Sequence, residues 1–312
     1  MKRAAFTMLE LIFVIVIMGI IGKFGVEFLM QAYNGFIFSA AQNRLQSQSE
    51  AAVTMIATRL QYRIKDSIIA RMNDGTNSFR ALANANGSER ILEWVGYDID
   101  GWRGRWNGSK NQPTWSGFID VDAIDDTKSL YTSDATTTRL VTPGSDLSIA
   151  DSIILDLSYT NADINSSAIK FIGGNSNIRT GYGWDGTATD QNSTMLPIRA
   201  DTNNGFTPLT GTGNWDLVDI YEYYQLAWTA YAIVHSEVTV NGKPSGILTL
   251  WYDYQPWLGE RYTDGTSAIL AEHVDTFRFR SIGDVIKIQV CTTDEDIFKD
   301  GEYSVCKEKT IF

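Results

Sequence analysis

Cysteine, histidine and proline are scarce in this chain, and basic residues are in the minority. Among 312 residues there are two cysteines, two histidines and six prolines, and 26 lysines and arginines stand against 37 acidic residues. Two thiolates fall short of the four ligands that structural zinc prefers. The acidic balance argues against a nucleic-acid partner, because phosphate binding needs clustered lysine and arginine. The first proline is Pro113, so nothing in the first hundred residues must break a helix.

The N-terminal segment carries most of the information. Lys2 and Arg3 precede a run over residues 6–22 that is apolar apart from one charge, Glu10. Residues 6–30 can span a bilayer, because about 20 residues at a rise of 1.5 Å each cover its core. The basic residues place the N-terminus in the cytoplasm and the rest of the chain outside. A carboxylate in such a segment costs roughly 3 kcal/mol at the helix centre, so it normally has a partner and a role.

Two ordinary explanations of this segment fit it less well. A secretory signal peptide also has a basic head and an apolar core, but its cleavage site follows the core and has an A-x-A pattern. The residues after Met18 are Gly-Ile-Ile-Gly-Lys-Phe-Gly, which contain no such site. A plain membrane anchor has no use for Glu10.

The run A-F-T-x-x-E, followed by about twenty apolar residues, resembles the class III signal of type IV pilins and type II secretion pseudopilins. The resemblance implies that a membrane prepilin peptidase cleaves between Ala5 and Phe6, removes residues 1–5 as a leader, and leaves a Phe6 amine that is methylated. The family usually carries glycine where Ala5 stands. In a filament, Glu10 would pair with the Phe6 amine of the next subunit in a medium of low dielectric constant. Pairing of Glu10 within its own N-terminus before assembly is the alternative.

A stripe of apolar or small residues continues beyond the apolar segment. Its members recur at a spacing of four or seven: Leu45, Ala52, Ile56, Leu60, Ile64 and Ile68. The spacing predicts an amphipathic helix over residues 31–74 that runs to about Met72 and ends in Asn73-Asp74-Gly75. Pilin-like subunits have the same build, a stalk helix whose second half packs under a β-domain.

Residues 75–312 predict an antiparallel β-rich domain, since aromatic residues accompany glycine, threonine and asparagine. Apolar runs predict strands over residues 151–159, 225–238 and 246–254. In the clearest pair, alternating residues predict a hairpin over 276–290 with Phe277 and Phe279 on its buried face. Residues 122–150 and 174–215 predict long loops or insertions. The expected fold class is α+β, with a long transmembrane and stalk helix before a pilin-like globular domain.

Cys291 and Cys306 enclose fourteen residues near the C-terminus. Outside the cytoplasm, a pair at this spacing is most simply a disulfide. Within the loop lies an acidic run that includes the candidate calcium ligands Asp294, Asp296, Asp300 and Glu302. A solvated acidic turn is the other explanation of this run. Calcium is the only cofactor for which the sequence offers candidate ligands.

The segment WVGYDIDGWRGRW, which ends at Trp106, allows two interpretations. It either fills the core of a β-domain or presents exposed rings as a sugar-binding platform. No serine or cysteine lies in a recognisable nucleophile motif, and nothing selects a pair of carboxylates for glycoside chemistry.

The resemblance implies a structural function. The chain would be a minor subunit that initiates or caps a type II secretion pseudopilus or a type IV pilus. Its partners would be other pilin or pseudopilin subunits, the prepilin peptidase, an inner-membrane assembly platform and membrane lipid. It would cross the bacterial inner membrane once, with a periplasmic domain that becomes extracellular in a pilus. A tip adhesin or substrate-binding head is the alternative, and a membrane-anchored enzyme is a third class.

Overall fold

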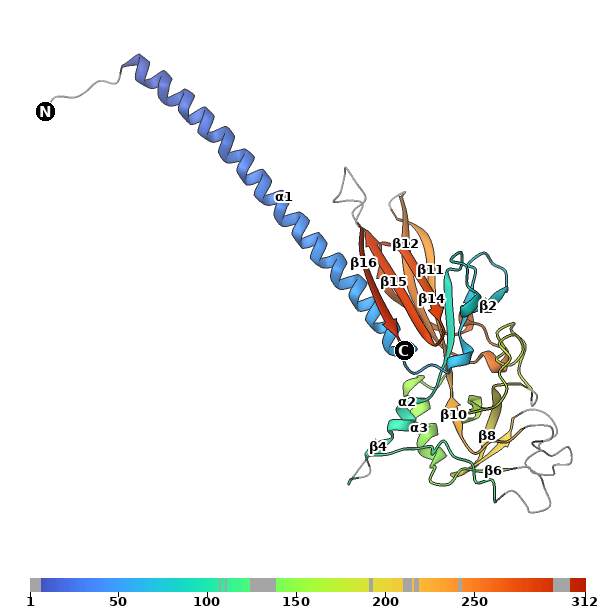
Figure 1. Cartoon of the computed structure of the whole chain (residues 1–312). Coiled ribbons are helices and arrows are strands. Elements are labelled where there is room, and N and C mark those ends of the chain that lie inside the picture. The colour runs from blue at the N-terminus through green and yellow to red at the C-terminus, as the bar shows by residue number, and fades with distance from the viewer. Residues whose placement is uncertain are drawn as a thin grey trace.

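A single long helix, α1 (Met8–Leu60), projects from a β-rich domain (Figure 1). The computed structural model describes residues 7–106, 108–109, 111–123, 139–190, 193–209, 215, 219–240, 243–293 and 304–312. The helix starts at a capping box formed by Thr7 and Glu10. Its buried residues lie only in its second half, at positions spaced by three and four: Ala41, Leu45, Ser49, Ala52, Val53, Ile56, Ala57 and Leu60. The expected α+β class, with a long apolar helix before an antiparallel β-rich domain, is confirmed.

The helix ends at Leu60, so the prediction that it runs to about Met72 is wrong. Beyond Leu60 the backbone pairs with a strand instead of continuing the helix. Arg63 bridges Gly96, and the Ile64 amide donates to the Val95 carbonyl oxygen at 2.8 Å. Ile64 and Ile68 therefore belong to a segment that lies along the edge of a strand and not to the helix. The four-residue spacing could not reveal this, because burial on two sides of a strand can place apolar residues at the same positions.

In the described residues, the β-structure consists of three antiparallel sheets and one short hairpin. The largest sheet has the order β13 (Thr266–Glu272), β12 (Lys243–Tyr254), β11 (Thr229–Val240), β3 (Ile91–Gly96), β1 (Ile69–Arg71) and β2 (Phe79–Ala81). The second has the order β10 (Tyr224–Ala227), β7 (Ala168–Phe171), β8 (Leu196–Thr202), β9 (Gly205–Pro208) and β6 (Leu140–Val141). The third comprises β14 (Val274–Ile282), β15 (Val285–Thr293) and β16 (Ser304–Ile311), and the short hairpin pairs β4 (Arg105–Trp106) with β5 (Asn111–Gln112). The strand predicted over 246–254 is confirmed as part of β12. The single strand predicted over 225–238 is wrong in one respect, because Trp228 divides it into β10 and β11, which belong to different sheets.

The C-terminal hairpin forms as its alternation predicts. Phe277 pairs with Val290 and Phe279 pairs with Ile288, and all four side chains are buried. Ile282 pairs with Val285, so Gly283 and Asp284 form a two-residue turn. Gly283 has a φ of +58°, a conformation that glycine adopts without strain.

The end of α1 packs against two sheets at once, and this contact fixes the stalk to the domain. One continuous core joins Ile56 and Leu60 of the helix to Trp94 of the large sheet and to Phe277 and Ile288 of the C-terminal sheet. Arg63 reinforces the contact, since its guanidinium donates to the carbonyl oxygens of Leu60 and Asp284, both at 2.9 Å.

The chain between β3 and β10 builds a lobe with its own core. Besides β4–β9 it contains α2 (Ile99–Arg103) and α3 (Leu147–Leu157). The strand predicted over residues 151–159 is wrong, because α3 occupies most of that range. The buried residues of α3 are Leu147, Ala150 and Ile154. They are spaced by three and four, as in a helix, whereas the strand was predicted from the apolar run alone. The prediction of loops over 174–215 is also wrong for β8 and β9, which form a hairpin there.

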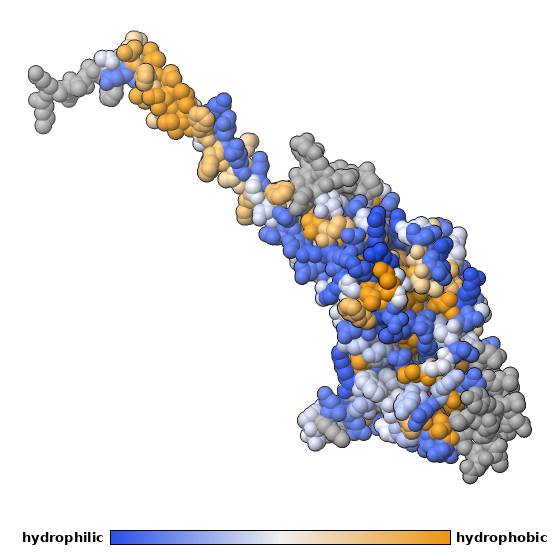
Figure 2. Space-filling view, viewed as in Figure 1, coloured by the Kyte–Doolittle hydropathy of each residue, from blue (hydrophilic) through white to orange (hydrophobic). Residues whose placement is uncertain are grey.

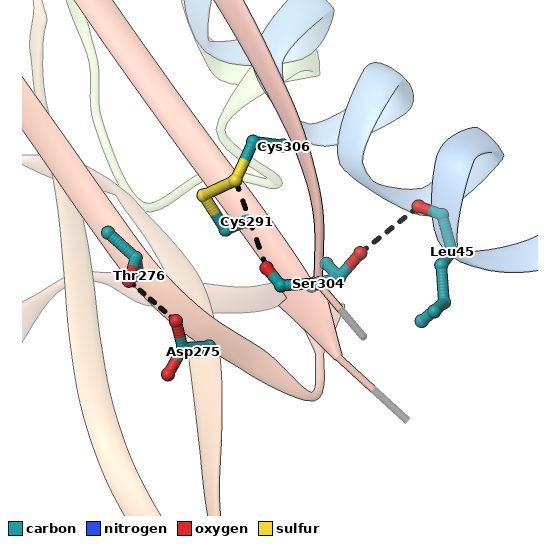
Figure 3. Close-up of a disulfide and its surroundings, with 7 residues drawn as sticks. Leu45, Asp275, Thr276, Cys291, Ser304 and Cys306 are labelled. Carbon is teal, nitrogen blue, oxygen red and sulfur yellow. Dashed lines mark hydrogen bonds between the residues drawn. A yellow bond between two sulfur atoms is a disulfide. The ribbon is translucent and has the colours of Figure 1, made fainter. Parts of the chain in front are cut away.

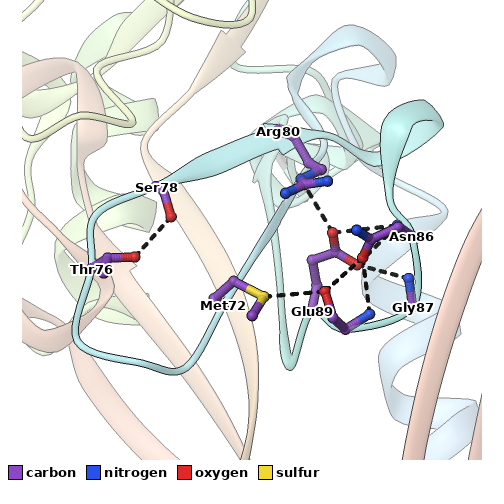
Figure 4. A network of polar contacts seen from close by, with 8 residues as sticks. Met72, Thr76, Ser78, Arg80, Asn86, Gly87 and Glu89 are labelled. Atoms are coloured by element: carbon purple, nitrogen blue, oxygen red, sulfur yellow. Dashed lines mark hydrogen bonds and ion pairs between the residues drawn. The ribbon is translucent and has the colours of Figure 1, made fainter.

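Short 3-10 helices connect some of these elements: η1 (Lys65–Ser67), η2 (Leu82–Asn84), η3 (Ile164–Ser166), η4 (Pro256–Leu258) and η5 (Tyr262–Asp264). The loop after η2 is held by one buried carboxylate, as Figure 4 shows. Glu89 accepts hydrogen bonds from the amides of Asn86 and Gly87, at 3.1 and 2.9 Å, and pairs with Arg80 at 3.2 Å. The side chain of Glu89 is 1 % exposed, so this network satisfies a charge that burial would otherwise penalise.

Candidate functional site

The first half of α1 presents apolar side chains with no protein around them. A window of this helix is long and apolar enough to cross a membrane, and none of that window is buried. Figure 2 shows the apolar surface on the part of the helix farthest from the domain. From Met8 to Ala41, the first buried residue of α1, the helix extends about 50 Å. This geometry is consistent with a single-pass membrane anchor.

Glu10 lies at the very start of this helix, and its carboxylate turns back toward the N-terminus. Its Oε2 accepts hydrogen bonds from the Thr7 amide at 3.2 Å and from the Thr7 hydroxyl at 3.1 Å. The N-terminal end of a helix favours negative charge, because its free amides carry the positive end of the macrodipole. The carboxylate therefore contacts Thr7, the residue that follows Phe6 in the sequence. Ala5 and Phe6 themselves lie outside the described residues, so the cleavage site stays a prediction.

Cys291 and Cys306 form a disulfide, as the sequence predicts (Figure 3). The two residues are direct partners on the neighbouring strands β15 and β16. Next to the bridge, the Thr292 hydroxyl donates to the Leu45 carbonyl oxygen of α1 at 3.1 Å. On the following strand, Lys307 pairs with Glu50 of the helix at 3.4 Å. The disulfide therefore fastens an edge strand that itself packs on the stalk.

Removing this bridge is expected to weaken the whole C-terminal sheet. Cys306→Ser should cost about 2–5 kcal/mol, because the unfolded chain regains the entropy of a closed loop. Thermal unfolding of the purified protein should show a lower midpoint, and reductant should lower the wild type but not the variant. Alkylation tests the bridge itself: labelling of both cysteines in native, unreduced protein would contradict it.

The candidate calcium ligands Asp294, Asp296, Asp300 and Glu302 all lie outside the described residues. Within the described ranges, no three histidine, cysteine or carboxylate side chains gather where they could hold a metal ion. Calcium binding by the loop therefore stays a prediction. The two histidines lie in or beside strands, with His235 buried in β11 and His273 between β13 and β14.

In the aromatic segment that ends at Trp106, some rings fill the core and others are exposed. Trp94 is fully buried in the core beneath α1, whereas Trp102 and Trp106 are 43 % and 62 % exposed. Asp98 separates the two groups and caps α2, accepting a hydrogen bond from the Gly101 amide at 3.0 Å. Its other oxygen accepts from the Trp115 indole N–H at 3.1 Å.

Asp98 makes stability depend on pH. Burial raises the pKa of Asp98 to about 6, against the opposing effect of its hydrogen bonds. Because this pKa is higher in the folded than in the unfolded protein, protonation of Asp98 adds to the free energy of unfolding. The added stability is complete below pH about 4 and is lost as the pH rises through about 6. Asp98→Asn should remove about 3 kcal/mol of that dependence. Unfolding free energies measured between pH 4 and 7 check this, and equal slopes for wild type and variant would contradict it.

The large sheet contains a buried ion pair that was not predicted from the sequence. Arg71 and Glu93 lie 2.6 Å apart, with side chains 8 % and 1 % exposed. The signal was present, since Glu93 is the one charge in the strand ILEWVG, and a buried carboxylate normally needs a partner. The pair connects β1 and β3 inside the protein, and Arg71 also donates to the Trp184 carbonyl oxygen at 2.9 Å. Its groups are therefore occupied by protein partners and do not face a ligand site.

The chain matches no known family, no curated protein and no solved structure.

Proposed function

We propose that this chain is a structural, pilin-like subunit that is anchored in the membrane by α1 and enters a filament. One observation carries the proposal: α1 is a single unbroken helix of 53 residues whose first half is apolar and unburied. Its second half packs under a β-domain. A helix of this build serves both as a membrane anchor before assembly and as a filament core after it.

The length of the apolar surface supports a filament over a plain anchor. From Met8, about 20 residues suffice for the hydrocarbon core, which would end near Glu27. Large exposed side chains nevertheless continue beyond that point, with Tyr33 and Phe36 65 % and 69 % exposed. Helices of neighbouring subunits would cover these rings. A lone anchor would leave them at or beyond the interface.

The finer assignment rests on the N-terminal resemblance. We infer that the prepilin peptidase removes residues 1–5, that an assembly platform extracts the mature chain, and that the chain is a minor subunit of a type II secretion pseudopilus or type IV pilus. The N-terminus would face the cytoplasm and the domain the periplasm. This role is structural and requires no catalysis or cofactor.

Fractionation of cells that assemble filaments tests the proposal. Sheared or purified filaments should contain the chain at a low ratio to the major subunit, and removal of the assembly ATPase should return all of it to the membrane fraction. A chain that stays in the membrane fraction in both strains contradicts the proposal.

A further inference from the structure

Two tryptophans stand out on the surface of the inserted lobe. All nine tryptophans lie in the described part of the chain, and only Trp102 and Trp106 are exposed, at 43 % and 62 %. Both belong to the run Trp-Arg-Gly-Arg-Trp that connects α2 to β4. An exposed indole does not contribute the large free energy that burial of its apolar surface would provide, so an exposed tryptophan suggests a binding role.

The backbone around these rings is firmly held. Trp102 packs on the buried Trp115, with ring centroids 4.9 Å apart. Gly104 has a φ of +74°, and a Cβ there would overlap the Gln112 carbonyl group, so the chain turns tightly against β5. Arg103 donates to the Tyr62 hydroxyl at 2.9 Å and ties the segment to the chain just after α1. Trp106 is therefore displayed from a rigid base, which reduces the entropy lost when a ligand binds.

A hollow of about 300 Å³ opens beside Trp106. Besides Trp106, its lining consists of Arg105, Gln112, Pro113, Asp146 and Ile149. The volume lies at the lower end of the range for small-molecule sites. The side chains of these residues include an indole, a carboxylate, a carboxamide and a guanidinium, and their formal charges cancel.

We propose that this hollow binds a neutral saccharide. One face of a pyranose with equatorial hydroxyls consists of axial C–H groups and packs flat on an indole. The hydroxyls at the ring edge both donate and accept, which matches the acceptor oxygens of Asp146 and the donor N–H groups of Arg105. A strongly charged ligand would leave one of the two opposite charges unfavourably placed.

Saccharide binding and filament entry are independent proposals, since the first rests on the inserted lobe and the second rests on α1. The strongest competitor for such a hollow is a proline-rich peptide, because tryptophan and proline side chains also line grooves for that ligand. A peptide of this kind would have little use for Asp146 and Arg105, and the saccharide uses both.

Titration calorimetry on the full chain tests the proposal, in a detergent without a sugar headgroup so that the micelle does not compete. The probes are cellotriose, triacetylchitotriose and a decaproline peptide. We expect at least one of the two saccharides to bind saturably with a Kd of about 1 mM or tighter. Trp106→Ala should weaken that binding at least about tenfold, and Trp106→Phe should retain part of it.

Tyr159→Ala is the matched control, because it removes another highly exposed ring, 84 % exposed, from beyond the other end of α3. It should leave binding unchanged. Since the Trp106 side chain is mostly exposed, Trp106→Ala should unfold at the wild-type temperature, which separates lost binding from lost fold. Absence of saccharide binding to the wild type, equal binding by Trp106→Ala, or a response to decaproline alone would each overturn the assignment.

Discussion

Glu10→Gln should abolish entry into filaments while leaving membrane insertion and the β-domain intact. Glutamine can still accept a hydrogen bond from the Thr7 amide, as Glu10 does at 3.2 Å, so the start of α1 is preserved. Only the charge is lost. Two opposite charges 4 Å apart attract by about 4 kcal/mol at an effective dielectric constant of about 20, and this attraction would be lost where the variant meets its neighbouring subunit.

Glu27→Gln is the matched control for this experiment. Glu27 lies on the same helix and is exposed, and it pairs with Lys23 at 3.9 Å, a type of contact worth little. Immunoblots of filament and membrane fractions should show Glu27→Gln in both and Glu10→Gln in the membrane alone. Normal incorporation of Glu10→Gln would refute the pairing with the Phe6 amine.

The second large effect concerns the buried ion pair of the large sheet. Arg71→Met should destabilise the domain by about 3–5 kcal/mol, because Glu93 would remain buried without its counter-charge. The loss is severe for Glu93, since burial already raises the pKa of its carboxyl despite the opposing effect of Arg71. The Tyr254 hydroxyl, 3.3 Å from the carboxylate, cannot replace a guanidinium.

Denaturant unfolding measures this loss, and Lys287→Met supplies the comparison. Lys287 and Glu308 are also 2.6 Å apart, but their side chains are 34 % and 50 % exposed. Breaking that exposed pair should cost about 0–1 kcal/mol. Replacing both buried partners, in Arg71→Met with Glu93→Gln, should recover part of the stability. Equal losses for Arg71→Met and Lys287→Met would show that burial does not strengthen the inner pair.

The features that the sequence predicted correctly are those with a local signal. Phe277 and Phe279 alternate with arginines, the apolar run at the N-terminus is long, and two cysteines stand alone. The end of α1 had no such signal, since Ile64 and Ile68 continue the helical spacing although their backbone lies along β3. The inserted lobe was also hidden, because α3 reads as a strand in isolation and β8 and β9 lie in a polar stretch.

The candidate site divides in the same way. The position of Glu10 in an apolar run predicted pairing with a Phe6 amine, which stays a prediction; the structure shows a contact of its carboxylate with Thr7 of the same chain. The hollow beside Trp106 could not be predicted, because Asp146 and Ile149 come from a distant part of the chain. The acidic run at residues 294–302 and the Ala5–Phe6 junction lie outside the described residues, and both remain predictions from sequence.

The nature of the mature N-terminus tests the central claim most directly. Intact-mass and N-terminal peptide analysis of protein extracted from membranes of its own host should find a chain that begins at Phe6 and carries one added methyl group on its amine. A chain that still begins at Met1, or one that begins after Gly22, would contradict the pilin-like assignment.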